Sequence, residues 1–330
     1  MIIAEIAQAH DGSLGFAHSF IEALADTGIH AVKFQTHIAE AESSIYEPFR
    51  INFSYQDKSR MDYWKRMEFS SDEWMGLKKH CHELGLEFIS SPFSLAAVDL
   101  LEAIGVERYK IGSGEVTNLL LLEKISSTGK PIILSSGMSS LTELDTAFNF
   151  LDKKGIDVSI LQCTTSYPTI PKEWGLNMIM ELKKRYSTTI GFSDHSGNIY
   201  ACLAAAALGA EIFEFHVKFH SKMFGPDTKS ALNIEEIKVL TKGISEIQES
   251  LANPVDKKDV KKYMALKDMF EKSLAVNKNL EKGHIINIED LETKKPKNKG
   301  LNASDYHYII GKKLKVNKTR WDFLQKEDLE

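Results

Sequence analysis

The chain is organised around the sequence Tyr109-Lys110-Ile111-Gly112-Ser113-Gly114-Glu115. An apolar segment with helical periodicity, residues 96–104, precedes it, and the stretch is typical of a short buried strand that runs out into a loop. Gly112 and Gly114 let the backbone approach a ligand closely. A lysine, small residues and a carboxylate at a strand end suit a phosphorylated substrate that exchanges a proton, although short Gly-Ser motifs also occur in plain solvated turns.

The same alternation of short apolar runs and amphipathic helices extends in both directions from this stretch. Strands are predicted at residues 1–6, 31–35, 87–91, 108–111, 131–135, 158–162, 188–192 and 211–215. Helices are predicted at residues 16–24, 72–84, 96–104, 119–127, 142–153, 177–184, 201–208 and 234–250, with Asp72 as the cap of the second. The pattern indicates an α/β fold with a parallel sheet, and eight strands favour a closed (β/α)₈ TIM barrel. Residues 36–70 are predicted to be a loop or hairpin that reaches over a site.

Composition narrows the class of protein. The chain has 330 residues, of which 43% are hydrophobic and 26% charged, and a formal net charge of -5. This balance fits a soluble protein with one large and one small domain, and the mild acidity argues against nucleic-acid binding. No apolar run or signal-like start predicts a membrane span or export, so we expect a cytoplasmic protein. The three scattered cysteines, Cys81, Cys163 and Cys202, argue against a disulfide framework.

Three segments follow from these patterns. Residues 1–252 are predicted to form the barrel, and residues 253–271, rich in lysine and aspartate, a linker. Residues 272–330 contain several short apolar runs and are predicted to form a small C-terminal domain. A domain of this size has little core of its own, so we expect it to need a partner surface.

Chemically useful side chains stand at or just past the end of almost every predicted strand. They are Glu5, Lys33, Gln35, Ser91, Lys110, Glu115, Ser135, Thr165, Tyr167, Ser193, His195 and His216. In a TIM barrel the carboxyl ends of the strands form the active-site face. Such a set favours one active site over a solvated rim.

An ordered series of motifs resembles the sialic acid synthase family, the phosphoenolpyruvate-condensing synthases of nonulosonic acids. The motifs are Ala4-Glu5-Ile6 with His10-Asp11-Gly12, Val32-Lys33-Phe34-Gln35, Ser91-Pro92-Phe93, residues 110–115, Leu134-Ser135-Ser136-Gly137-Met138, Cys163-Thr164 with Tyr167-Pro168, residues 191–195, and Gly225-Pro226-Asp227. The C-terminal segment resembles the antifreeze-like (SAF) domain of these synthases. The resemblance therefore covers nearly the whole chain and also implies a TIM barrel followed by a SAF domain.

The resemblance implies a transferase of the N-acetylneuraminate synthase type. Phosphoenolpyruvate would condense with an open-chain N-acetylated amino sugar and water, giving a 3-deoxy-2-keto nonulosonic acid and phosphate. Catalytic roles would fall to Glu115, Glu5, His195 and His216. Phosphoenolpyruvate would be bound by Lys33, Gln35, Ser91, Lys110, Ser113, Ser135, Thr165 and Ser193, and the sugar by Glu5, Tyr167, Asp227 and Lys295. An ion pair with Lys110 alone is the plainer interpretation of Glu115.

His195 and His216 resemble the two imidazole ligands of a divalent metal, usually Mn²⁺, with Mg²⁺ or Co²⁺ as alternatives. They end successive predicted strands, so neighbouring strand ends can present both to one ion; a hydrogen-bonded structural role is the plainer interpretation of either alone. The family also implies a domain-swapped homodimer, in which the SAF domain covers the partner's active site.

Several positions depart from the family pattern, mostly on the sugar side. Residues 7–10 read Ala-Gln-Ala-His where Gly-x-Asn-His is usual, Thr165 stands where asparagine or serine is common, and Lys295 replaces an arginine. The acceptor therefore stays open: N-acetylmannosamine or a related sugar, a diacetamido-trideoxyhexose as in legionaminic or pseudaminic acid synthesis, or a phosphosugar as in octulosonate synthesis. A catalytically silent sugar-binding protein is the alternative outside the enzymes.

Overall fold

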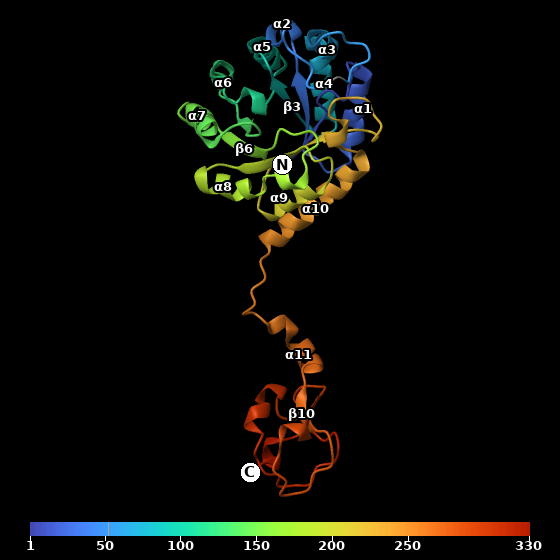
Figure 1. The fold of residues 1–330 in the computed structure, drawn as a ribbon, viewed down its shortest axis with the longest axis vertical. Helices are drawn as coiled ribbons and strands as arrows, with labels where there is room; N and C mark the ends of the chain where they lie inside the picture. Colours follow the sequence, from blue (N-terminus) through green and yellow to red (C-terminus); the bar gives the residue numbers. More distant parts are fainter. Residues whose placement is uncertain (52) are drawn as a thin grey trace. The chain divides into compact units, whose positions relative to one another are not determined.

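A computed structural model describes residues 1–51 and 53–330 of the chain. It divides into two compact units, Met1–Asn253 and Pro254–Glu330, each of which is described separately (Figure 1). The first unit is the predicted barrel. Helix α10 is its last element, and the segment 36–70 lies between its second and third strands.

Eight parallel strands form the barrel, and each is paired with its neighbours in chain order. They are β1 (Ile2–Glu5), β2 (Ala31–Thr36), β3 (Glu87–Pro92), β4 (Tyr109–Ile111), β5 (Ile132–Ser135), β6 (Val158–Cys163), β7 (Ile190–Asp194) and β8 (Phe213–Val217). Pairing of β1 with β8 closes the sheet, with Glu5 opposite His216. The short β9 (Ala231–Leu232) extends the sheet beside β8. The predicted (β/α)₈ barrel is thus confirmed.

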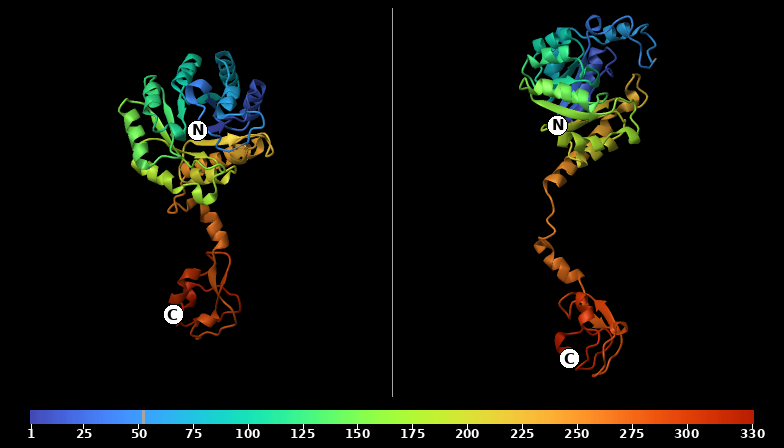
Figure 2. Two further views of the ribbon diagram at one scale, coloured as in Figure 1. Left: turned by 45° about the horizontal axis from the view of Figure 1, so that its top comes forward. Right: turned by 60° about the vertical axis from the view of Figure 1, so that its left-hand side comes forward.

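Helices surround the strands on the outside of the barrel (Figure 2). They are α1 (Leu14–Ala25), α4 (Ser71–Glu83), α5 (Leu95–Ile104), α6 (Leu119–Ser126), α7 (Leu141–Asp152), α8 (Asn177–Arg185), α9 (Tyr200–Ala207) and α10 (Ile234–Ala252). The prediction that Asp72 caps α4 is wrong. Ser70 is the cap, because its hydroxyl accepts from Glu73 N while the Glu73 carboxylate accepts from Ser70 N, a reciprocal capping box.

The segment 36–70 also differs from the prediction of a loop or hairpin. It contains two helices, α2 (Ala39–Glu42) and α3 (Arg60–Met67), and residue 52 lies outside the described residues. A capping box at Ser59 starts α3, and the helix buries Tyr63, Trp64 and Met67 in a small core with Ala39. Because α3 has only eight residues and four of them are charged, its helical periodicity was hard to detect.

Alternation along the strands builds the barrel interior in layers. Ile3, Ala31, Ile89, Ile133, Leu161 and Ile212 pack together as one apolar layer inside the barrel. Side chains two positions further along a strand point to the same face. The next layer toward the carboxyl ends is therefore polar, and it comprises Glu5, Lys33, Ser91, Ser135, Cys163 and Glu214. The apolar layer thus forms a dry floor beneath a polar site.

The second unit is a small domain with its own core. Strands β10 (Ser273–Val276) and β11 (Leu291–Lys294) pair antiparallel, and the short helix α11 (Met264–Phe270) precedes them. Its buried core comprises Leu274, Val276, Leu280, Ile286, Ile309, Leu314, Leu324 and Leu329. Among residues 1–51 and 53–330, no helix of either unit combines the length and the apolar character that a membrane crossing requires.

Candidate active site

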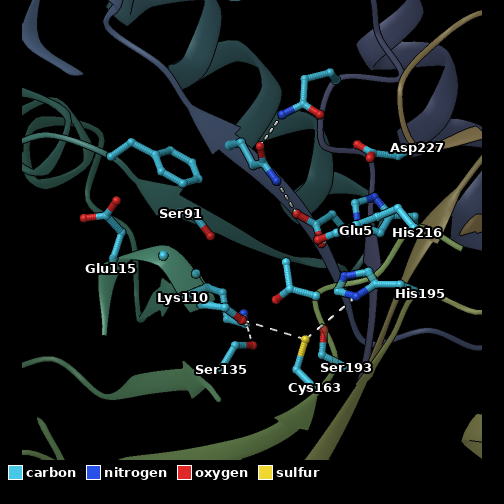
Figure 3. Close-up of a pocket in the computed structure, with 18 of the residues that line it drawn as sticks. Glu5, Ser91, Lys110, Glu115, Ser135, Cys163, Ser193, His195, His216 and Asp227 are labelled. Atoms are coloured by element: carbon cyan, nitrogen blue, oxygen red, sulfur yellow. Dashed lines mark hydrogen bonds and ion pairs between the residues drawn. The ribbon is translucent and has the colours of Figure 1, made fainter. Parts of the chain in front are cut away.

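A cavity of about 500 Å³ opens at the carboxyl ends of the barrel strands (Figure 3). The structure brings together around it every predicted site residue of the barrel: Glu5, Lys33, Gln35, Ser91, Lys110, Ser113, Glu115, Ser135, Thr165, Tyr167, Ser193, His195, His216 and Asp227. Glu115 and Asp227 lie on opposite sides of the cavity (Figure 3). One set of strand ends therefore forms one site, as the spacing of these residues predicts.

Two buried lysines and two buried carboxylates form the base of the cavity. Lys33 Nζ lies 2.5 Å from Glu5 Oε1 and 3.7 Å from Glu214 Oε2. Lys110 Nζ lies 3.3 Å from Glu214 Oε1 and donates to Ser135 Oγ at 2.6 Å. All four charged side chains are almost fully buried, so each charge depends on its partner.

Glu214 is a site residue that sequence reasoning missed. Its Oε1 also accepts from Ser193 Oγ at 3.0 Å, so one carboxylate links both lysines to the β7 hydroxyl. The signal was present: Glu214 and His216 are two positions apart in β8 and therefore point to the same face. Cys163 was missed in the same way, two positions after Leu161.

At the base of the cavity, neighbouring charges shift the pKa values of Glu5 and Lys33 more than burial does. Burial alone would raise the pKa of Glu5, but Lys33, His216 and Lys110 together hold it well below its ordinary range. Burial alone would lower the pKa of Lys33, but Glu214 and Glu5 raise it above its ordinary value. Both groups are therefore charged at neutral pH, and Lys33 presents a fixed cation in a site of low dielectric.

Two buried polar atoms at the base have no hydrogen-bond partner within the described residues, although one of them lies in an ion pair with Lys33. Within residues 1–51 and 53–330, neither Ser91 Oγ nor Glu214 Oε2 has a hydrogen-bond partner, although both atoms are buried. Native proteins satisfy nearly all buried polar groups. Such atoms beside a cavity are typical of a site whose ligand completes the hydrogen bonding.

Glu115 lies apart from the lysines. It ends the 3₁₀ turn η1 (Ser113–Glu115), and its Oε2 accepts from Asn118 Nδ2 at 2.7 Å. Burial raises its pKa above the ordinary value. Within the described residues, Lys110 pairs with Glu214 and forms no ion pair with Glu115. The plainer interpretation of Glu115 as the Lys110 partner is therefore wrong.

The two predicted metal ligands are neighbours. The rings of His195 and His216 lie 5.3 Å apart, and His216 Nε2 is 3.4 Å from Glu5 Oε2. His195 Nδ1 lies 3.0 Å from Thr164 O, an arrangement that leaves Nε2 for another ligand. No group of three or more His, Cys, Asp or Glu side chains arranged to hold a metal occurs in the described part of the chain. The residues thus fit a cation held by two imidazoles whose other positions go to water or substrate.

The pKa values of the two imidazoles are shifted in opposite directions. Burial alone would lower the pKa of His195, but the neighbouring Cys163 thiol, with Sγ 3.8 Å from Nδ1, raises it to about 9. Burial lowers the pKa of His216. A cation held by both rings would therefore have to displace the His195 proton.

The segment 36–70 supplies an outer wall of the cavity, as its predicted position over a site implies, although its individual residues were not assigned. His37 is stacked between Trp64 and Phe93, with ring centroids 3.8 and 4.8 Å away, and its Nδ1 lies 2.7 Å from Glu42 Oε1. Gln8, His37, Glu42, Glu47, Arg50, Arg60, Trp64 and Phe93 line the cavity as well. Glu42, Glu47, Arg50, Arg60 and Trp64 lie away from any strand end and gave a weak signal, whereas His37 and Phe93 directly follow β2 and β3 and were overlooked.

Lys295 belongs to the second unit. Its ammonium lies 4.9 Å from the ring centroid of Phe270. Its predicted contact with the sugar therefore stays a prediction.

Comparison with known proteins decides the family. The model of the NeuB family matches residues 20–256, and that of the SAF domain matches residues 271–330. The chain is 36% identical to the N,N'-diacetyllegionaminic acid synthase of Campylobacter jejuni, over 94% of this chain and 95% of that protein.

The chain belongs to the NeuB family.

Further proteins that this NeuB chain is similar to are also named synthases or synthetases. The chain is 29% identical to the human N-acetylneuraminate-9-phosphate synthase, over 99% of this chain and 91% of that protein. The crystal structure of the N-acetylneuraminic acid synthetase of Leptospira borgpetersenii, in complex with citrate, is similar with a TM-score of 0.71 and 31% identity. The alignment covers 80% of this NeuB chain and 89% of that one. The predicted family and its SAF domain are thus confirmed.

Proposed function

We propose that this chain is a nonulosonic acid synthase that condenses phosphoenolpyruvate with an open-chain N-acetylated amino sugar. The observation that carries the proposal is the buried pair Lys33 and Lys110 at the base of the cavity, next to the His195 and His216 imidazoles, in a NeuB-family barrel. Fixed cations and hydroxyl donors in a buried site suit a small polyanion. We further propose a cytoplasmic enzyme whose product enters cell-surface polysaccharide.

The base of the cavity suits phosphoenolpyruvate. Lys33 and Lys110 supply the cations, and hydroxyl and amide groups around them supply neutral donors: Gln35, Ser91, Ser113, Ser135, Thr165 and Ser193. Ser91 Oγ, which has no partner within the described residues, is free to donate to the ligand. Because these donors are already in position before phosphoenolpyruvate binds, they orient it at little entropic cost.

We propose that Glu115 handles the proton. In the proposed reaction, C3 of phosphoenolpyruvate bonds to the aldehyde carbon, water bonds to C2, and the C–O bond to phosphate breaks. The water must lose a proton, and the aldehyde oxygen must gain one. A carboxyl whose pKa burial raises above the ordinary value exchanges a proton more readily near neutral pH.

The sugar side of the cavity suits a polyhydroxy chain. Glu5, Tyr167 and Asp227 offer hydroxyl and carboxylate groups there, and Arg50 is paired with Asp227 at 2.7 Å. The 36% identity to a diacetyllegionaminic acid synthase favours a diacetamido sugar as a second candidate beside N-acetylmannosamine.

We propose that His195 and His216 hold a divalent cation, Mn²⁺ first and Mg²⁺ or Co²⁺ as alternatives. When bound, such a cation polarises the carbonyl group of an aldehyde. Chelation should abolish turnover, and addition of Mn²⁺ should restore it. Full activity of a preparation shown to be free of metal would refute this assignment.

We also propose a homodimer in which the SAF domain of one subunit completes the sugar site of the other. Lys295 would supply the contact. The small size of that domain's core supports the need for a partner surface.

Phosphate release tests the proposed function. Phosphoenolpyruvate and Mn²⁺ are incubated with a panel of N-acetylated aldoses and with their 6-phosphates. We expect phosphate release with at least one unphosphorylated aldose and a lower kcat/KM with its 6-phosphate. A preference for the 6-phosphate would favour a phosphosugar synthase, and no release with any aldose would favour a silent sugar-binding protein.

A further inference from the structure

Arg50 reaches the sugar side of the cavity from the segment between α2 and α3. Its Nη2 donates to Asp227 Oδ1 at 2.7 Å and lies 3.5 Å from Pro226 O. Its guanidinium carbon lies 4.2 Å from the ring centroid of Tyr167. Arg50 thus contacts two side chains assigned to the sugar, which come from the loops after β6 and β8.

Tyr167 connects Arg50 to the candidate metal site. The Tyr167 ring centroid is 4.2 Å from that of His195 and 6.0 Å from that of His216. The Tyr167 ring therefore contacts both the Arg50 guanidinium and the His195 imidazole.

Arg50 has hydrogen-bonding capacity to spare. A guanidinium carries five N–H donors in a fixed plane. Within the described residues only Nη2 is engaged, so the donors on Nε and Nη1 remain available. The Arg50 side chain is 42% exposed and that of Asp227 17%, so the pair faces the open side of the cavity.

A structural role alone does not account for this placement. An exposed ion pair adds little to stability, because water screens both charges. The same pair gains strength when a bound sugar displaces that water. A guanidinium beside a carboxylate also offers a donor and an acceptor together, the combination that a hydroxyl group matches.

We propose that Arg50 is a specificity-determining residue that donates a hydrogen bond to an oxygen of the acceptor sugar, while Asp227 accepts one from it. The inference rests on the proposed function and deepens it. The oxygen belongs either to a hydroxyl or to the carbonyl of an acylamino group, since both accept from a guanidinium. Arg50 stands in the same chain as the barrel that it serves, unlike a contact from a partner's SAF domain.

Steady-state kinetics of Arg50→Ala and Arg50→Lys test the proposal. Loss of a charged hydrogen bond should raise the KM of the acceptor roughly 10- to 100-fold in Arg50→Ala and leave the KM of phosphoenolpyruvate within about twofold. Arg50→Lys should fall between, because lysine keeps the charge and loses the planar fork. An unchanged acceptor KM in Arg50→Ala, or an equal rise of both KM values, would overturn the proposal.

Arg185 provides a matched control. Its Nε donates to Asp145 Oδ1 at 2.8 Å, and its guanidinium lies 6.0 Å from the ring of Tyr186, the residue after α8, outside the residues that line the cavity. Arg185→Ala should leave both KM values unchanged. A similar rise of the acceptor KM in this variant would show that loss of any such cluster disturbs the barrel, and would overturn the assignment to Arg50.

Direct binding separates this inference from the proposed function. The open-chain sugar alcohol of N-acetylmannosamine lacks the reacting aldehyde, so its affinity by calorimetry is independent of turnover. We expect Arg50→Ala to bind it about tenfold or more weakly than the unmodified chain. Equal affinity would overturn the proposal even if the enzyme is active. The sugar alcohols of mannose and of the 6-deoxy sugar identify the oxygen that Arg50 contacts. For the analogue that lacks this oxygen, Arg50→Ala and the unmodified chain should bind with equal affinity.

Discussion

In the proposed reaction, the proton chemistry depends on Glu115. Its carboxylate is half-buried, contacts Asn118, and stands away from the paired lysines. Glu115→Gln keeps the shape and the contact with Asn118 but removes proton exchange. Turnover should fall roughly 10²- to 10⁴-fold, whereas phosphoenolpyruvate affinity by calorimetry should stay nearly unchanged. Turnover close to that of the unmodified chain would show that Glu115 carries no proton.

The raised pKa of Glu115 also makes stability depend on pH. Because burial disfavours the ionised form, the folded chain retains this proton at a higher pH than the unfolded chain does. Stability contributed by the neutral carboxyl is full below the ordinary pKa of glutamate and is lost as pH rises through the raised value.

Glu115→Gln has no carboxyl to ionise, so it should not lose stability as pH rises through the raised pKa of Glu115. Thermal unfolding should show Glu115→Gln gaining Tm relative to the unmodified chain between about pH 4 and about pH 7. The exposed Glu181→Gln serves as the control for removal of a carboxylate at the surface. Equal pH dependence of Glu115→Gln and the unmodified chain would contradict the burial argument.

At the scale of elements, the strands could be predicted from the sequence and the segment between β2 and α4 could not. Strand ends were visible because apolar runs and polar residues alternate at fixed spacing, and the closed barrel brings those ends together. Glu214 and Cys163 obeyed the same alternation but were not recognised as site residues: Glu214 lies inside β8, and Cys163 ends β6 and was noted only within a family motif. Arg50 has no such signal: its place beside Tyr167 depends on tertiary packing of residues 36–70.

Gly191 shows how closely the strands pack around the site. A Cβ there would lie against the carbonyl oxygen of Ile212, 2.8 Å from Ile212 Cβ and 2.5 Å from Leu161 Cδ2. Gly191→Ala should therefore destabilise the barrel by roughly 1–3 kcal/mol in urea unfolding.

Gly76 provides the matched control for Gly191. It lies inside helix α4, and a Cβ there would meet nothing within 4 Å. Gly76→Ala should stabilise the chain by about 0.5–1 kcal/mol, because alanine loses less entropy in a helix. A Gly191→Ala variant as stable as the unmodified chain would contradict the packing described for β7.

At the scale of the whole molecule, the proposed dimer requires that the SAF domain act on the other subunit. A chain ended near Pro254 keeps the barrel and should lose most activity. Mixing it with a full-length Glu115→Gln chain should restore activity, because the intact SAF domain of the inactive subunit would cover the active barrel. Mixed dimers verified by mass that remain inactive would rule out this arrangement.

The most direct test of the central claim follows the atoms of phosphoenolpyruvate. Phosphoenolpyruvate carrying isotopically heavy oxygen in the bridge between C2 and phosphorus is incubated with Mn²⁺, the chain and the best acceptor of the panel, and the products are analysed by mass spectrometry. Condensation with C–O cleavage predicts that the heavy oxygen leaves with phosphate and that the keto acid contains the carbons of both substrates. Heavy oxygen in pyruvate, with no product that joins the two substrates, would contradict the account.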